Sequence, residues 1–104
     1  MLKSTIYTDA TPLGRNRYLI GYITPDGVIP SQYKVISCKD INIAELESIL
    51  FAIDNCPIGY TIYSDNLNAV NVCNTTHEDV SIMYCNRLLN VANNYLRAIK
   101  EGFK

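Results

Sequence analysis

The chain has 104 residues, of which nine are Lys or Arg and ten are Asp or Glu, giving a formal net charge of −1. This length provides one hydrophobic core but not two, so we expect a single domain over residues 1–104. With 48% apolar and 18% charged residues, the composition excludes an intrinsically disordered chain. The near-neutral charge excludes an overall basic surface, so any binding of nucleic acid must come from local clusters.

The sequence contains no signal for a membrane or for secretion. No apolar run approaches the roughly 18 residues of a membrane span, and residues 1–4 lead directly into a strand-like pattern. We therefore expect a cytoplasmic protein with no membrane partner. Cys38, Cys56, Cys73 and Cys85 contain no CxxC pair and are expected to be reduced thiols that pack as small apolar side chains. The single His77 has no cysteine near it, so no zinc site is expected.

The N-terminal third alternates between strand-forming stretches and turn signals. Ser4–Asp9 is rich in β-branched and aromatic residues and predicts a strand that breaks at Thr11–Asn16. Arg17–Thr24 predicts a second strand, followed by a tight turn at Pro25–Gly27. Val28–Ser37 predicts a third strand. The protein is thus expected to open with a three-stranded antiparallel meander.

A helix is predicted next, because the apolar period changes after Asp40. Asn42 or Asp40 can cap its start, and the proline of Cys56-Pro57 ends it. Tyr60–Ser64 predicts a fourth strand, which should lie beside the first and parallel to it because a helix crosses over between them. The helical spacing is carried by Ile43, Leu46, Ile49, Leu50 and Ile53.

The C-terminal part of the chain is expected to be helical. A short helix over about Leu67–Cys73 and a loop over Asn74–His77 lead into one long helix with an apolar stripe. The predicted order is β-β-β-α-β-α-α, an α/β fold with a mixed sheet and without a fifth strand. The stripe consists of Ile82, Cys85, Leu89, Ala92, Leu96, Ile99 and Phe103.

This long helix is apolar over more than one stripe, which favours a homodimer built partly on it. The alternative is that the helix packs entirely on its own sheet and on the first helix. The residues that widen the apolar surface are Met83, Tyr84, Leu88, Val91 and Tyr95. The polar face could then follow phosphates through Arg87, Asn90, Asn94, Arg97 and Lys104.

One internal repeat indicates where a functional site lies. Thr5–Asp9 and Thr61–Asp65 are nearly the same pentapeptide, and each is a predicted strand that ends in Asp. Side by side, parallel and in matched register, the two strands would bring both carboxylates to the same edge. Such a pair raises the pKa of its members unless a cation lies between them. The alternative is that Asp merely ends each strand as a turn former.

A third carboxylate is expected from the helix between these two strands. Glu45 and Glu47 both lie in its first turns, on opposite flanks of the apolar face. The helical pattern alone does not choose between them, and either could be an ordinary solvated Glu near a helix N-terminus.

Three short motifs, in this order, resemble the ribonuclease H family: Tyr7-Thr8-Asp9-Ala10, Asn42-Ile43-Ala44-Glu45-Leu46 and Tyr63-Ser64-Asp65-Asn66. In that family an Asp ends the first strand, a Glu stands in the first helix and an Asp ends the fourth strand. The segment 8–14 is especially similar to the ribonuclease H domains of reverse-transcribing viruses and retroelements. The likeness of segment 43–50 to the family's helix favours Glu45 over Glu47, and the resemblance covers roughly residues 4–74.

The resemblance implies a ribonuclease H-like fold and an endonuclease that hydrolyses the RNA strand of RNA–DNA hybrids. Its catalytic and metal-binding residues would be Asp9, Glu45 and Asp65, and its cofactor Mg²⁺ or Mn²⁺. The implied partner is nucleic acid, with RNA distinguished through its 2′-hydroxyl groups. Candidates for contacts to the substrate, or else polar loop residues without a special role, are Asn16, Asn42 and Asn66.

The sequence departs from the family in its last third. A complete member continues with a fifth strand and a final helix that carries a fourth metal-binding Asp, and this chain is expected to be truncated before both. The remaining candidates for that carboxylate are Glu78, Asp79 and Glu101, or a residue of a second chain. His77 does not match the loop histidine that assists product release in many members.

Four functions stay open on these observations. They are the metal-dependent ribonuclease, a non-catalytic ribonuclease H-like module that binds nucleic acid or protein, a DNA nuclease or resolvase of the same superfamily, and a small α/β domain without a site. The nuclease is preferred because three convergent acids have no evident use without a metal.

Overall fold

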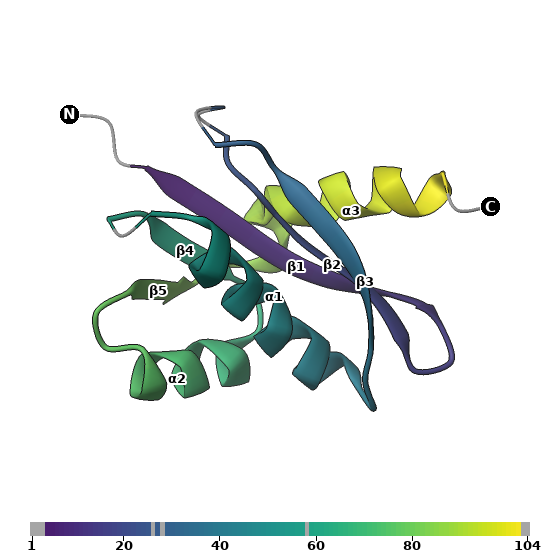
Figure 1. The fold of residues 1–104 in the computed structure, drawn as a ribbon, viewed down its shortest axis with the longest axis horizontal. Helices are drawn as coiled ribbons and strands as arrows, with labels where there is room; N and C mark the ends of the chain where they lie inside the picture. Colours follow the sequence, from purple (N-terminus) through teal and green to yellow (C-terminus); the bar gives the residue numbers. More distant parts are fainter. Residues whose placement is uncertain (1–3, 26, 28, 58, 103–104) are drawn as a thin grey trace.

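A mixed sheet of five strands, in the order β3-β2-β1-β4-β5, forms the centre of the described chain (Figure 1). This computed structural model describes residues 4–25, 27, 29–57 and 59–102. The strands are β1 (Thr5–Gly14), β2 (Arg17–Ile23), β3 (Gln32–Ser37), β4 (Thr61–Ser64) and β5 (Ser81–Tyr84). The helical elements are α1 (Ile41–Asn55), α2 (Leu67–Thr76), the 3₁₀ turn η1 (Arg87–Leu89) and α3 (Val91–Glu101).

The predicted strand pairing is confirmed for the first four strands. β1 pairs antiparallel with β2, and β2 with β3, so the chain opens with the expected meander. β4 lies parallel to β1, with Thr5 opposite Thr61 and Tyr7 opposite Tyr63. The two similar pentapeptides therefore share one register, and the rings of Tyr7 and Tyr63 stack with centroids 5.3 Å apart. The α/β class and the mixed sheet are as predicted.

Helices cover both faces of this sheet. The main core lies between the strands and α1 with α2, and includes Ile6, Tyr22, Ile49 and Ile62. α3 packs on β1 and β2, and its Leu96 lies against Gly21, the neighbour of Tyr22. Because successive strand residues point to opposite faces, α3 covers the face opposite α1 and α2 (Figure 1).

The expectation of one long C-terminal helix without a fifth strand is wrong. Residues 81–84 form β5, parallel to β4, then η1 follows, and the final helix begins only at Val91. β5 has only four residues, and only Ile82 among them is buried. The sequence therefore does not show the alternation of apolar and polar residues that predicts a strand. The chain therefore does not stop before a fifth strand and a last helix.

The homodimer prediction rested on that long helix and loses its original basis. Leu96 is fully buried within the protein, whereas Leu89 lies outside α3 and is 67% exposed. The stripe therefore is not one surface. Phe103 and Lys104, the last residues of the predicted stripe and polar face, lie outside the described residues. Dimerisation itself stays a prediction.

Several element boundaries also differ from those predicted. β1 continues through Thr11–Gly14, because β2 pairs with it there. On its other side β1 pairs with β4 only up to Tyr7, so no strand requires a backbone N–H from Pro12 on that side. β3 begins at Gln32, and Val28 lies outside the described residues. α2 extends to Thr76, where Thr75 and Thr76 donate hydrogen bonds to carbonyls one turn back.

Other local expectations hold. Asp40, one of the two proposed caps, accepts a hydrogen bond from the backbone N–H of Ile43. Gly27 has φ 72° at the predicted turn, although Asp26 lies outside the described residues. All four cysteines are free, and Cys73 is fully buried in the core. No helix within the described ranges is long and apolar enough to cross a membrane.

Gly21 allows the close approach of α3 to the sheet. A Cβ atom at this position would lie 2.9 Å from Leu96 Cδ2 and 2.7 Å from the backbone oxygen of Gln32. Both distances are shorter than van der Waals contact, and the backbone oxygen cannot move without disturbing the pairing of β2 with β3. The position of α3 therefore depends on a glycine here.

We predict that Gly21→Ala lowers the free energy of unfolding by about 1–3 kcal/mol, because the added methyl group overpacks this contact. Gly14→Ala is the matched control: a Cβ there meets nothing within 4 Å, and its effect should stay within about 0.5 kcal/mol. Urea denaturation of the two variants measures both values. Equal stability of the two would contradict the packing described for α3.

Candidate metal centre

Three carboxyl groups from separate parts of the chain converge in space. Asp9 lies in β1, Glu45 in α1 and Asp65 directly after β4, and one ligand oxygen from each lies within 4.8 Å of the others. The sequence predicted this convergence. Glu47, on the other flank of α1, is only half-buried and does not join the cluster.

The local sequence explains why these side chains meet. Asp9 follows Tyr7 by two residues and Asp65 follows Tyr63 by two, so the matched register of β1 and β4 leaves both acids at equivalent points. α1 begins at Ile41, one residue after its cap Asp40, which places Glu45 in the second turn beside the buried Ala44. Each acid is therefore fixed by backbone that the rest of the fold determines.

Burial makes this cluster costly when no cation is bound. Asp9 is 5% exposed and Glu45 4% exposed. Burial first, and the charge of Asp65 second, raise the pKa of Asp9 to about 6. Burial, then the charge of Asp9 and a hydrogen bond with it, raise the pKa of Glu45 to about 10. Without a cation, Glu45 is therefore neutral at pH 7.

One oxygen of Glu45 lacks the partner that a buried polar atom normally has. Within the described residues, Glu45 Oε2 is buried and accepts or donates no hydrogen bond. A buried polar atom of this kind is costly unless a further group completes its environment. A divalent cation between the carboxylates would meet this requirement and favour the ionised forms of Asp9 and Glu45.

The carboxylates open onto a hollow of about 440 Å³. Arg87 from η1 and Asn93 from α3 line it together with the three acids, and Arg87 lowers the pKa of Asp9 slightly against the larger effect of burial. Asn66 also lines the hollow. Its side chain caps α2 by accepting a hydrogen bond from Ala69 N at 2.9 Å, and it donates a hydrogen bond to Asn42 Oδ1 at 3.1 Å. The site thus combines hard oxygen ligands with one cationic side chain.

Asn90 joins the last helix to this site, a role that the sequence pattern does not reveal. Its side chain is buried and caps α3, accepting a hydrogen bond from Ala92 N at 3.1 Å. The same amide donates to the carbonyl oxygen of Thr8 at 2.8 Å and to Asp65 Oδ2 at 3.3 Å. An Asn before an apolar helical pattern is a cap signal, but the apolar stripe places the start of this helix earlier in the chain.

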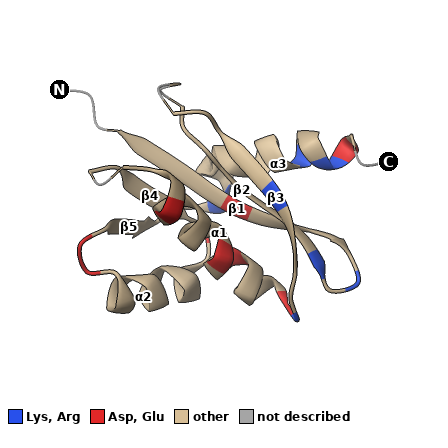
Figure 2. Cartoon of the chain, in the orientation of Figure 1, with Lys and Arg blue, Asp and Glu red and all other residues tan. Residues whose placement is uncertain are grey.

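The other sequence candidates lie away from the carboxylates. Asn16 is in the turn between β1 and β2, with φ 55°. Glu78 and Asp79 are in the acidic loop between α2 and β5 (Figure 2), and Glu101 ends α3. None of these three acids joins the carboxylate cluster in the part of the chain that the structure describes. His77 lies beside Thr76, with Nδ1 2.9 Å from Oγ1.

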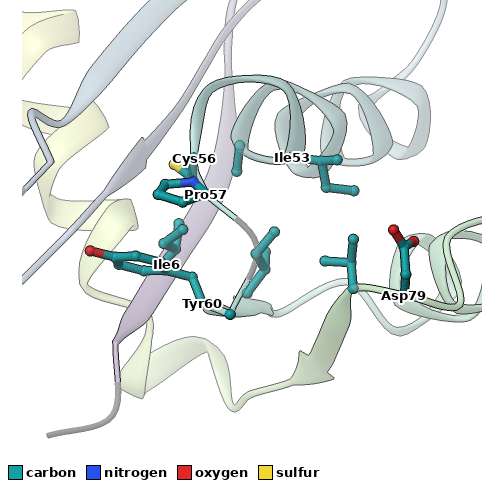
Figure 3. A pocket seen from close by; sticks show the side chains of 10 residues that line it. Ile6, Ile53, Cys56, Pro57, Tyr60 and Asp79 are labelled. Atoms are coloured by element: carbon teal, nitrogen blue, oxygen red, sulfur yellow. The ribbon is translucent and has the colours of Figure 1, made fainter.

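A second hollow, of about 240 Å³, lies near the starts of β1 and β4 and is mainly apolar (Figure 3). Ile6, Cys56, Pro57 and Tyr60 line it, and among the described lining residues Asp79 has the one carboxylate. A single acid among apolar side chains does not make a site for hydrolysis or for a divalent ion. The carboxylate cluster is therefore the stronger candidate for function.

The sequence matches no protein-family model, and it has no significant match among curated proteins. The assignment to the ribonuclease H family therefore stays a proposal that rests on the motifs and on the geometry of this site.

The burial of Glu45 and Asp9 predicts how the stability of the metal-free protein depends on pH. Both acids keep their protons in the folded state at pH values where the unfolded chain has released them, so unfolding releases protons. The stabilisation that the folded state gains by keeping these two protons is complete below about pH 4. It decreases as the pH rises through about 6 and towards about 10.

We therefore expect the free energy of unfolding, measured with a chelator, to fall between about pH 5 and about pH 9, by at most about 1.4 kcal/mol per pH unit for each proton. Glu45→Gln should reduce this slope and stabilise the metal-free protein at neutral pH, because the amide stays neutral. Glu47→Gln should keep the wild-type slope. A Glu45→Gln variant with an unchanged slope would contradict the burial and coupling described here.

Proposed function

We propose that the protein is a metal-dependent ribonuclease of the ribonuclease H type, which hydrolyses the RNA strand of RNA–DNA hybrids. The observation that carries this proposal is the convergence of Asp9, Glu45 and Asp65, with the unpartnered oxygen of Glu45 buried among them. The presence of β5 and a final helix after β4 also supports it, because the resemblance implies both elements for a complete member.

The donor set fits Mg²⁺ or Mn²⁺, since both prefer carboxylate oxygens and retain bound waters. Such an ion would activate a water molecule and stabilise the leaving oxygen of a phosphodiester. Asp9, Glu45 and Asp65 would hold it, and Asn90 orients Asp65 through the 3.3 Å hydrogen bond. Arg87, which lines the same hollow, places a positive charge where a phosphate would approach.

Charge balance indicates how many ions the protein holds by itself. Three ionised carboxylates carry three negative charges, which one divalent ion more than half neutralises. Together with the positive charge of Arg87 in the same hollow, one divalent ion balances these three charges. A second divalent ion would leave two excess positive charges, which a bound phosphodiester reduces to one. The resemblance implies a fourth metal-binding Asp on the final helix, whereas here Asn90 caps this helix and Asn93 lines the hollow from it. We therefore propose that a second ion enters with the substrate.

The same two asparagines favour one alternative, a non-catalytic ribonuclease H-like module that binds nucleic acid. Its site would hold an ion and a phosphate but would hydrolyse neither strand. A DNA nuclease or resolvase of the same superfamily would use the same carboxylates on another substrate. The choice depends on activity, which the second experiment below measures.

The first experiment tests the metal site. Mg²⁺ or Mn²⁺ should raise the melting temperature, because an ion that binds only the folded state stabilises it by about 2.7 kcal/mol at 100 times its Kd. Asp9→Asn and Asp65→Asn should abolish this increase and slightly stabilise the metal-free protein by relieving repulsion. Glu47→Gln should respond to the ions like the wild type. An increase that survives Asp9→Asn would mean that the ions bind elsewhere.

The second experiment tests hydrolysis of labelled RNA–DNA hybrid, duplex DNA and duplex RNA in Mg²⁺ and in Mn²⁺. We expect cleavage of the RNA strand of the hybrid, and its loss in Asp9→Asn, Glu45→Gln and Asp65→Asn, while Glu47→Gln retains it. Cleavage of duplex DNA alone would support the resolvase-like alternative. Binding of the hybrid without cleavage of any substrate would support the non-catalytic module.

A further inference from the structure

A further hollow, polar and distinct from the apolar one in Figure 3, continues from the candidate metal centre along the last helix. It has a volume of about 300 Å³ and shares Arg87 and Asn93 with the hollow that contains the carboxylates. We call it the α3 groove. The residues that line it are Arg87, Leu88, Asn90, Asn93, Asn94 and Arg97.

The charge of the α3 groove is one-sided. It contains two arginines and three asparagines, and no acidic side chain lines it. Both Arg87 and Arg97 are exposed. The first turn of α3 contains no acidic residue of its own, and the Asp65 carboxylate lies at the start of the helix, 3.3 Å from the side chain of its cap Asn90. The lining of the groove itself is suited to an anion.

The spacing of these residues fits an extended anion. Asn90, Asn93 or Asn94, and Arg97 follow each other at helical intervals and so share one face of α3. Asn93 and Arg97 are four residues apart, which corresponds to about 6 Å along the helix axis, or about two nucleotide steps of one DNA strand. The amide of Asn90 is already engaged, which leaves Asn93, Asn94 and the two arginines for a ligand.

We propose that the α3 groove binds the backbone phosphates of the nucleic-acid strand that passes over the metal centre. The path of that strand over the carboxylates rests on the proposed function. Phosphate binding by the groove itself does not require a metal ion. Arg87 would contact the phosphate nearest the carboxylates, because it lines both hollows, and Arg97 a phosphate further along the same strand. The side chain of Leu88, 94% exposed, would contact a sugar between them.

The test is the binding of a fluorescent RNA–DNA hybrid to the full chain in the presence of a chelator, followed by anisotropy at several salt concentrations. Arg87→Gln and Arg97→Gln should each weaken binding by about tenfold and reduce the slope of log K against log salt by about 1. Lys100→Gln is the matched control, because it removes one positive charge from the same helix outside the groove. It should weaken binding by less than about twofold.

Two results would overturn the proposal: binding unchanged in both arginine variants, or the same loss in Lys100→Gln, which would indicate diffuse attraction instead of a groove. Since both arginines are exposed, the variants should retain the wild-type melting temperature. The outcome is separable from that of the proposed function. Arginine-dependent binding without cleavage by the wild type would keep the groove and reject the nuclease. Cleavage together with binding that does not depend on the arginines would support the nuclease and reject the groove.

Discussion

The parallel pairing of β1 with β4 in matched register is the constraint on which the rest of the structure depends. It sets Asp9 and Asp65 at equivalent points of neighbouring strands. Because parallel neighbours need a crossover connection, it also requires α1, whose second turn carries Glu45 to the same place. A shift of one residue in this register would turn Asp65 to the other face and dissolve the cluster.

This convergence works against stability in the absence of a cation. Burial and mutual repulsion raise the pKa values of Asp9 and Glu45, and one oxygen of Glu45 has no partner among the described residues. The fold tolerates the cluster because each acid is held by an element with its own core contacts, such as Ile6 in β1 and Ile49 in α1. Sites under such strain are where function is commonly found.

The sequence predicted the site better than it predicted the end of the chain, for a physical reason. The register of β1 and β4 can be predicted because the two strands have nearly the same sequence, Thr5–Asp9 and Thr61–Asp65. The helix α1 can be predicted because it has a cap and a clear apolar period. β5 has four residues and a single buried side chain, so its position depends on pairing with β4, which no local pattern reveals. Glu45 and Glu47 could not be separated by periodicity, because only the packed fold decides which flank of α1 is buried.

The start of the final helix matters for the site, because the residues just before it link the carboxylate cluster to its surroundings. With the final helix starting at Val91, Asn90 becomes a buried cap bonded to Thr8 and Asp65, and Arg87 comes to line the carboxylate hollow. The segment 85–97 then has two functions at once: its buried side supports Asp65, and its exposed side carries the charges of the α3 groove. A phosphate held in that groove would therefore lie beside the carboxylates without displacing any group that supports them.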